Sequence, residues 1–461
     1  MNALDGLLGE ARARYQAANP KSQAAHREAS QYMPGGNTRS VLHFEPFPLT
    51  IASGQGASLV DLDGHQYIDF VGEFSAGIHG HSDPAIGAAI RQAVDQGIGL
   101  GAPGTGEGQL AKILCQRFDS IERVRFCNSG TEANLMALAA ARVITGRSRI
   151  LVFNGAYHGG VIKFPEGHSD LNVPYDFVYA DYNDTSGTAR LIREAGADLA
   201  AVIVEPVLGA GGNIPGSPGF LKMLREATRD SGSLLVFDEV KTARLGPAGM
   251  QGLLGIRPDL TTLGKIIGGG LPIGAFGGPA GIMDHFNPRK PGSWKHAGTF
   301  NNNVCSMAAG CAALGAVYTA SRARRFFEWS ESVRCGLNEL FRARGVPMVC
   351  NGTGSMFAIH FSETPLSRMV IRDAARHTLH RLLHMELLLG GILICTRGDL
   401  FLSLPLTDDH IDKLRGGLEQ FIDRHRDALE QFRGAEAALP SGRSPEDPVR
   451  VHPGEAAGPA D

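Results

Sequence analysis

The chain has 461 residues, of which 43% are hydrophobic and 20% charged, a composition typical of a globular protein with two or three domains. The formal net charge of −3 gives no electrostatic reason to expect a nucleic acid or an anionic membrane as a partner. Residues 1–23 lack the apolar core of a signal peptide, no stretch resembles a membrane span, and the seven cysteines form no CxxC pair. We therefore expect a cytoplasmic protein with reduced thiols.

The first 70 residues are predicted to contain a helix followed by a β segment. The helix is expected to continue to Tyr32 and to end at Met33-Pro34-Gly35-Gly36, because proline and glycine stop helices. Residues 57–70 alternate apolar and polar side chains around Asp63-Gly64, which predicts a β-hairpin. We assign residues 1–70 to the smaller of two domains.

Residues 71–320 are assigned to a large domain, because short apolar segments alternate with helical ones there. Helical stretches such as 133–143 and 219–230 separate the predicted strands. These strands cover residues 124–127, 149–153, 200–205, 234–238 and 260–263. The alternation predicts an α/β fold with a mainly parallel sheet covered by helices. Ligands of such sheets bind at the carboxyl ends of the strands, where acids and glycines cluster in this sequence.

Residues 321–432 have a different character and are assigned to the smaller α+β domain. Two long arginine-rich helices and a few short strands are expected, followed by a final amphipathic helix over 408–432 that begins at Thr407-Asp408-Asp409. Residues 433–461 are rich in proline, glycine, alanine and charged residues, and we predict a disordered tail there.

Lys265 lies between an apolar run and Gly268-Gly269-Gly270, which is not the setting of an ordinary solvated lysine. Burial disfavours the charged form of an ammonium group, so such a lysine can be a nucleophile near neutral pH. The apolar segment before it in the sequence ends in Asp238-Glu239-Val240, at a predicted strand end. A reactive lysine and an acid are the two groups that pyridoxal phosphate requires. Lys241 is a rival amine, but it lies in a polar Lys-Thr-Ala-Arg stretch.

The string Asn128-Ser129-Gly130-Thr131 follows a predicted strand and opens a predicted helix. Small residues leave backbone N–H groups accessible there, and the N-terminal end of a helix favours an anion. The string therefore predicts a phosphate site made by Ser129, Gly130 and Thr131, with an ordinary capped helix as the alternative.

Together with Asp238-Glu239-Val240 and Gly264-Lys265, the string Asn128–Asn134 resembles the class III aminotransferases, which are pyridoxal-phosphate enzymes of fold type I. The resemblance covers about residues 30–425. It is nearest to the aminotransferases of β-amino acids, including β-phenylalanine-type substrates, and the glutamate-1-semialdehyde aminomutases are a related branch. It implies a large domain that binds pyridoxal 5′-phosphate and a smaller α+β domain.

The resemblance also implies individual roles at the cofactor. Lys265 would hold the cofactor covalently, Asp238 would pair with its pyridine nitrogen, and Ser129, Gly130 and Thr131 would bind its phosphate. Tyr157 and Val240 would lie on opposite faces of its ring. Glu205 would lie beside the cofactor, either in direct contact or as polar scaffolding. Thr299, in the string 298–303, would reach the phosphate of the neighbouring subunit and so imply an obligate homodimer, the alternative being a surface turn.

Two arginines match positions that hold carboxylates in the family. The one matching Arg39 binds the carboxylate of the β-amino acid, and the one matching Arg397 binds the α-carboxylate of glutamate or 2-oxoglutarate. Surface salt bridges are the alternative for both. The chain departs from many relatives at Thr396, where they have proline, and at Phe74, where some aromatic-selective ones have tyrosine. We expect these departures to affect side-chain preference at the substrate site.

These inferences combine into one predicted function. The chain is expected to be an aminotransferase that moves an amino group between a β-amino acid and 2-oxoglutarate or another keto acid by a ping-pong mechanism. A glutamate-1-semialdehyde-type aminomutase is the main alternative, and Arg397 argues against it because an acceptor-binding arginine suits an external keto acid. A non-catalytic cofactor-binding protein is a further alternative. His377, His380 and His384 share a helical spacing but lack additional ligands, so no metal site is expected.

Overall fold

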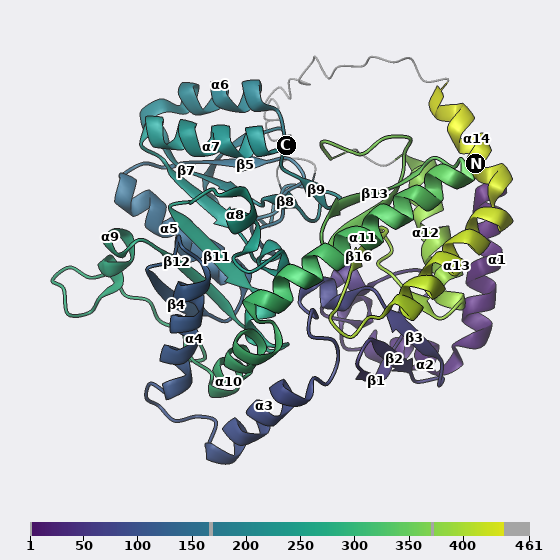
Figure 1. Ribbon diagram of the computed structural model, residues 1–461, viewed down its shortest axis with the longest axis horizontal. Coiled ribbons are helices and arrows are strands. Elements are labelled where there is room, and N and C mark those ends of the chain that lie inside the picture. The colour runs from purple at the N-terminus through teal and green to yellow at the C-terminus, as the bar shows by residue number, and fades with distance from the viewer. Residues whose placement is uncertain (1, 166–168, 370–372, 438–461) are drawn as a thin grey trace, which may run out of the picture.

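The computed structural model of the protein describes residues 2–165, 169–369 and 373–437. Figure 1 shows a large α/β part at the left of the view and a smaller part at the right, where the first and last helices lie side by side. The two parts meet along α11 (Ala320–Arg344), which runs from the large part into the smaller one.

The large part is built on a seven-stranded sheet with the order β4-β12-β11-β10-β7-β5-β6. Neighbouring strands run parallel except around β12, which is antiparallel to both β11 and β4. In chain order the strands are β4 (Arg123–Cys127), β5 (Arg149–Phe153), β6 (Asp176–Ala180), β7 (Leu199–Val204), β10 (Leu234–Asp238), β11 (Leu260–Gly264) and β12 (Gly274–Gly278). The predicted α/β fold with a mainly parallel sheet is confirmed, as are the five strands predicted within it.

Helices connect these strands and cover the sheet. α5 (Gly130–Thr145) packs on the middle of the sheet and α7 (Pro218–Ser231) packs against β7 and β10. Every residue of β7 is buried, as expected for a central strand covered on both faces. The remaining helices of this part are α3 (Pro84–Gln96), α4 (Thr105–Arg117), α6 (Thr185–Ala195), α8 (Gly249–Leu254), α9 (Ala280–Met283) and α10 (Val304–Ala312), and β8 (Val207–Leu208) pairs with β9 (Ile214–Pro215).

Local sequence determines where α5 and α7, the two helices described above that pack on the sheet, begin and end. The Ser129 hydroxyl accepts a hydrogen bond from the Glu132 N–H at 3.2 Å and caps α5, and Ser217 caps α7 in the same way. Each helix ends at a glycine in the left-handed region, Gly146 at φ 66° and Gly232 at φ 68°. Because α5 is capped at Ser129, its N-terminus lies directly after the carboxyl end of β4.

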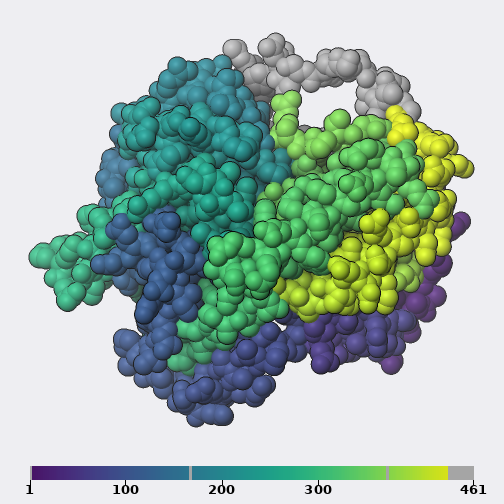
Figure 2. Space-filling model, in the orientation of Figure 1, coloured from purple at the N-terminus to yellow at the C-terminus, as the bar shows by residue number. Residues whose placement is uncertain are grey.

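The smaller part joins segments from both ends of the chain. β1 (Ile51–Gln55), β2 (Ser58–Asp61) and β3 (Gln66–Asp69) form a sheet whose last member, β15 (Ile392–Leu393), comes from the C-terminal region and runs parallel to β3. The predicted hairpin around Asp63-Gly64 is therefore present as β2 and β3. Figure 2 shows the N-terminal segments, in purple, directly beside the C-terminal ones, in yellow.

The other elements of the smaller part complete this arrangement. β13 (Met348–Thr353), β14 (Met356–Phe361) and β16 (Asp399–Phe401) form an antiparallel sheet. Its helices, besides α11, are α1 (Asn2–Ala18), α2 (Pro20–Ala29), α12 (Ala374–Leu389), α13 (Asp408–Arg424) and α14 (Arg426–Ala437). We keep the division at residues 70, 320 and 432 as a proposal for the domains.

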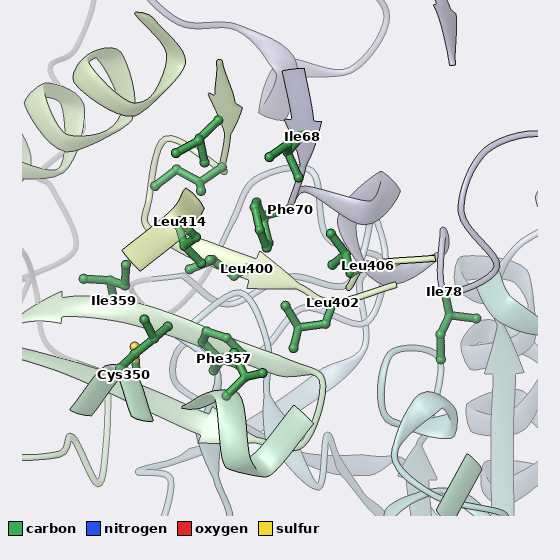
Figure 3. Close-up of a cluster of buried hydrophobic side chains, with 14 of the residues drawn as sticks. Ile68, Phe70, Ile78, Cys350, Phe357, Ile359, Leu400, Leu402, Leu406 and Leu414 are labelled. Carbon is green, nitrogen blue, oxygen red and sulfur yellow. The ribbon is translucent and has the colours of Figure 1, made fainter. Parts of the chain in front are cut away.

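Buried apolar side chains hold the N-terminal and C-terminal segments together. Figure 3 shows Ile68 and Phe70, at the end of β3, close to Leu400 and Leu402 of the C-terminal region. All four residues are at most 8% exposed. Burial of a side chain of this size contributes about 1.5–3 kcal/mol, so this contact gives the segments far apart in sequence a common core.

Three predicted helix boundaries were wrong. The single helix predicted up to Tyr32 is two helices, because the chain breaks at Asn19 before Pro20. The single helix predicted over 408–432 is also two, separated at His425. The helix α14 continues to Ala437, past the point at which the tail was predicted to begin, and the rest of the predicted tail lies outside the described residues.

Within the described ranges, no single helix has the length and apolarity to cross a membrane. Residues 304–317 and 320–344 are long and apolar enough for a membrane span only when they are taken together, and the chain bends by 71° between them.

Candidate active site

The predicted cofactor residues meet at one cavity of about 340 Å³ at the carboxyl ends of the central strands. This is the edge at which open parallel sheets bind ligands, and the volume is in the range of small-molecule sites. The cavity is lined by eight residues that the sequence predicted: Ser129, Gly130, Thr131, Tyr157, Glu205, Asp238, Val240 and Lys265. They follow five different strands or strand connections, so the fold brings together residues that are far apart in sequence.

Lys265 follows β11 directly and opens a short 3-10 helix, η6 (Lys265–Gly268). Its φ of 51° lies in the left-handed region, which costs a residue with a side chain free energy and is found at functional sites. The pKa of Lys265 is lowered from 10.5 to about 8, chiefly by burial and then by the neighbouring Lys241, while Asp238 and Glu205 act in the opposite direction. A substantial fraction of this amine is therefore neutral and nucleophilic near physiological pH.

Asp238 is the most tightly held acid of the cavity. Its Oδ2 accepts hydrogen bonds of 2.8 Å from Asn134 Nδ2 and from His158 Nδ1, and its Oδ1 accepts one of 3.0 Å from the Val240 N–H. Asn134 is fixed in turn by the Thr262 hydroxyl, at 2.6 Å. The carboxylate is 3% exposed and lines the cavity, so it is oriented toward whatever occupies that space.

The N-terminus of α5 lines the cavity, where the sequence predicted a phosphate site. The first N–H groups of a helix have no partner within the helix, so Gly130 and Thr131 can offer theirs to a phosphate. Ser129 lines the cavity and also caps the helix. Close packing explains the glycines: a Cβ on Gly130 would lie 2.8 Å from Val240, and one on Gly159 would lie 2.4 Å from the Thr131 hydroxyl.

Glu205 and Tyr157 also line the cavity. Glu205 is 3% exposed and accepts N–H groups from Tyr157 at 2.9 Å and from Gly209 at 3.1 Å. Burial raises the pKa of this carboxyl group. The Tyr157 side chain is 44% exposed, which leaves its ring available to a ligand. Glu205 thus positions the Tyr157 backbone and also lines the cavity, so both of its predicted interpretations remain open.

The polar groups that line the cavity can be compared with those of the predicted cofactor. His158 Nε2 is buried and, among the described residues, has no hydrogen-bond partner, while Nδ1 holds Asp238. An acid kept in place beside a buried amine, with a helix N-terminus at the far end, matches the pyridine nitrogen, aldehyde and phosphate of pyridoxal phosphate. The residues present therefore fit this cofactor.

Arg39 and Phe74 lie outside that cavity, in an adjoining apolar pocket of about 560 Å³. Arg39 forms an ion pair with Glu73, and its guanidinium lies 5.2 Å from the centre of the Phe74 ring. Glu73 lines both spaces and so connects them. Glu73 and Phe74 both have left-handed backbone, with φ of 48° and 50°. This strained turn, η3 (Gly72–Ser75), points to a functional constraint.

Arg397 is placed elsewhere and is held by its own chain. Its Nε and Nη2 each lie 3.1 Å from Asp399 Oδ2, and Nη1 donates to the Ala210 carbonyl at 3.3 Å. Asp399 Oδ1 accepts a hydrogen bond from Asn213 at 2.9 Å. Asp399 raises the pKa of Arg397. Arg397 lines a pocket of about 270 Å³ and not the cavity of Lys265, but its charge acts on Lys241, which does line that cavity.

Thr299 is exposed and does not line the cavity of its own chain. Two residues later, Asn301 Oδ1 accepts a hydrogen bond of 2.9 Å from Asn128, next to the capping Ser129. The loop that carries Thr299 is therefore anchored beside the N-terminus of α5, while Phe300 on the same loop is 67% exposed. A contact of Thr299 with a neighbouring subunit stays a prediction.

Sequence reasoning missed three contributors to the site. His158 and Asn134 hold Asp238, and Glu73 pairs with Arg39. His158 lies in the string Tyr157-His158-Gly159, and Asn134 lies in the string that predicted the phosphate site. Only this nearness to predicted site residues could have indicated from the sequence that the two residues belong to the site. In the described part of the chain, no group of three or more histidine, cysteine, aspartate or glutamate side chains is arranged to hold a metal ion.

Comparison with known proteins agrees with this geometry. The family model described as Aminotransferase class-III matches residues 42–422. Beta-phenylalanine transaminase of Variovorax paradoxus is 48% identical over 423 residues, which cover 92% of this chain and 97% of that protein. Glutamate-1-semialdehyde 2,1-aminomutase 2 of Brevibacillus brevis is 38% identical over 85% of this chain and 96% of its own length.

Two solved structures also resemble the chain in fold and sequence. The crystal structure of the beta-phenylalanine aminotransferase from Variovorax paradoxus has a TM-score of 0.90 and 48% identity, covering 92% of this chain and 99% of that one. A transaminase solved with PLP bound has a TM-score of 0.80 and 33% identity, covering 90% of this chain and 99% of that one.

Proposed function

This chain belongs to the class III aminotransferases, which depend on pyridoxal phosphate, and on that premise we propose that it acts on β-amino acids, including aromatic ones. The observation that carries the proposal is the connection of two spaces through Glu73: the cavity of Lys265 and the apolar pocket of Arg39 and Phe74. The similarity to an enzyme named for beta-phenylalanine supports the same substrate class.

The division of labour at the cofactor follows from the groups in place. Pyridoxal phosphate, when bound, supplies an electron sink for the carbon that carries the substrate amine. Asp238 would hold the pyridine nitrogen and favour its protonated form, since Asn134, His158 and the Val240 N–H orient the carboxylate. The Lys265 amine would hold the cofactor and, when free, would remove and return the proton at the substrate carbon.

The adjoining pocket suits a substrate with a carboxylate and an apolar side chain. Arg39 presents a planar guanidinium, which binds a carboxylate through two hydrogen bonds. Its present partner Glu73 is exposed on the surface of the turn, so a substrate carboxylate can take the place of Glu73. Around them the pocket is lined by apolar side chains, including Val41, Leu42 and Ile51, which are at least 38% exposed and available to an aromatic group.

The second half of the reaction requires an amino acceptor. We assign the α-carboxylate of 2-oxoglutarate or another keto acid to Arg397, which must then exchange Asp399 for the substrate. The two half-reactions would follow one another at one site, in a ping-pong sequence. We further propose a cytoplasmic homodimer in which Thr299 of each subunit completes the phosphate site of the other.

An aminomutase is the second candidate, because relatives named glutamate-1-semialdehyde 2,1-aminomutase are up to 40% identical to the chain. The two functions differ in whether an external acceptor is consumed. An aminotransferase given 2-oxoglutarate as acceptor produces one glutamate for each donor molecule converted, whereas an aminomutase produces an isomer and no glutamate.

The test is the visible absorption of the bound cofactor during titration with β-phenylalanine and other β-amino acids. We expect these donors to abolish the absorption and 2-oxoglutarate to restore it, with stoichiometric glutamate. Absorption that responds only to α-amino acids, ω-amines or semialdehydes would contradict the β-amino acid assignment while leaving the family assignment intact.

A further inference from the structure

The cavity beside Lys265 contains a second lysine. Lys241 follows the end of β10 by three residues, and its side chain lines the same cavity as Lys265. The sequence placed it in a polar stretch, whereas the three residues after it, Thr242, Ala243 and Arg244, are buried. The polar stretch is folded inward, and Lys241 faces the site.

The surroundings of Lys241 are crowded and charged. Its ammonium nitrogen lies 4.8 Å from the centre of the Phe401 ring. A Cβ on Gly209 would lie 2.6 Å from that nitrogen and 3.0 Å from a Glu205 carboxylate oxygen, so only glycine leaves room for both groups. The remaining charged or titratable groups that act on Lys241 are Asp399, Arg397, Cys395 and Lys265.

The donors of Lys241 are unsatisfied within the described ranges, because its ammonium makes no hydrogen bond and no ion pair there. Both nearby carboxylates are occupied: Glu205 accepts two backbone N–H groups, and Asp399 holds Arg397. Burial lowers the pKa of Lys241, as expected where water is scarce. Lys241 is only partly buried and lines the cavity, so an ammonium that the described residues do not hold can donate to a ligand in that space.

We propose that Lys241 is a second cationic residue of the active site, whose ammonium group donates to an anionic oxygen of the molecule held beside Lys265. The inference rests on the proposed function, which supplies that molecule. Two oxygens qualify, because the N-terminus of α5 takes the phosphate. One is the ring oxygen of pyridoxal phosphate next to the carbon that reacts with Lys265, and the other is a substrate carboxylate.

The neighbouring charges make the effect of Lys241 measurable. A cation beside Lys265 disfavours a second positive charge there, whether on the free amine or on the linkage to the cofactor. Removal of the Lys241 charge should therefore raise the pH midpoint at which the bound cofactor changes its visible absorption, by about one pH unit. A residue that only fills space would leave this midpoint unchanged.

The experiment compares Lys241→Met, which removes the charge and keeps the length, with Lys241→Arg, which keeps the charge. Lys222→Met, on the exposed face of α7, is the matched control for loss of one surface charge. For each protein we would measure the cofactor Kd, the pH midpoint of the absorption without substrate, the KM of donor and acceptor, and thermal unfolding without cofactor.

We expect Lys241→Met to unfold without cofactor at the same temperature as the wild type or a higher one, because the substitution breaks no hydrogen bond or ion pair among the described residues and removes a charge close to Lys265. We expect its pH midpoint to rise and either the cofactor Kd or a substrate KM to rise about tenfold. A rise in Kd identifies the cofactor ring oxygen, and a rise in KM alone identifies the substrate carboxylate. Lys241→Arg should keep most of the wild-type behaviour, and Lys222→Met all of it.

An unchanged midpoint, Kd and KM in Lys241→Met would overturn the proposal. So would a lower unfolding temperature with unchanged binding, which is the result expected of a structural lysine. Lys241→Gln is the second variant if the methionine variant does not fold. Failure of the proposed function can be distinguished from failure of this inference. If the wild type binds cofactor but does not react with β-amino acids, the cofactor Kd and the pH midpoint can still be measured, because neither requires substrate.

Discussion

The cofactor end and the substrate end of this site are built in different ways. The cofactor residues follow central strands and are fixed by hydrogen bonds within the large part of the chain, as Asp238 is by Asn134 and His158. The two arginines of the substrate end instead have carboxylate partners of their own, Glu73 for Arg39 and Asp399 for Arg397. The first end is preorganised, and in the proposed function the second would exchange these partners for a substrate carboxylate.

This difference suggests that the residues of the cofactor end determine the reaction and that the two arginines determine which substrates bind. A rigid cofactor end holds the reacting amine, acid and phosphate site in one arrangement for every substrate. Arginines that already hold carboxylates can accept one carboxylate in place of another at a modest net cost, which suits an enzyme that must bind two different substrates in turn. Substitutions at the two ends should therefore affect different kinetic constants.

The largest effect is expected at the rigid end. Lys265→Ala removes both the attachment point of the cofactor and the base, so turnover should fall by about four orders of magnitude or more. The measurement is steady-state amino transfer by purified protein with added cofactor. Activity within tenfold of the wild type would exclude Lys265 as the essential amine.

Arg39→Ala should raise the KM of the β-amino acid about 100-fold with a smaller effect on kcat, because charged hydrogen bonds contribute about 1.5–3 kcal/mol. The control is Glu73→Gln, which frees Arg39 from its ion pair and should lower that KM or leave it unchanged. Equal increases in KM for both variants would show that the pair is structural.

Arg397→Ala should weaken binding of the amino acceptor, with an increase of about tenfold in the acceptor KM when the keto acid is 2-oxoglutarate. This effect is smaller because Asp399 already competes for the arginine. The KM of the amino donor should change little, and Arg397→Lys should give an intermediate result because lysine lacks the planar fork. A selective loss of donor affinity would reverse the roles of the two arginines.

The last prediction concerns the pH dependence of cofactor capture. Because burial lowers the pKa of Lys265 to about 8, its nucleophilic neutral form accumulates as the pH rises toward that value. The rate at which cofactor-free enzyme captures pyridoxal phosphate should rise about tenfold per pH unit below the pKa and level off above it. Stopped-flow absorbance measures this rate, and a profile that still rises steeply near pH 10 would contradict a lowered pKa.

The sequence predicted the rigid end well for a physical reason. Strands buried on both faces give continuous apolar runs, and the residues that end them, such as Asp238 and Glu205, must lie at one edge of the sheet. The break at Pro20 and the separation at His425 were missed because the polar and apolar pattern continues through both positions.

The substrate end was predictable only in part. Arg39 and Arg397 were found by their resemblance to family positions, but their partners Glu73 and Asp399 depend on loop conformations that no local pattern encodes. The inward turn of Lys241 is of the same kind, because burial of Thr242 to Arg244 is a tertiary effect that overrides a polar sequence.

The central claim is that Lys265 is the residue that carries the cofactor, and borohydride reduction of the holoenzyme followed by peptide mass spectrometry tests it most directly. Reduction fixes the cofactor to whichever amine holds it. We predict one labelled peptide, with the added mass on Lys265. A label on Lys241, the other lysine of the cavity, or on neither residue would contradict the role of Lys265.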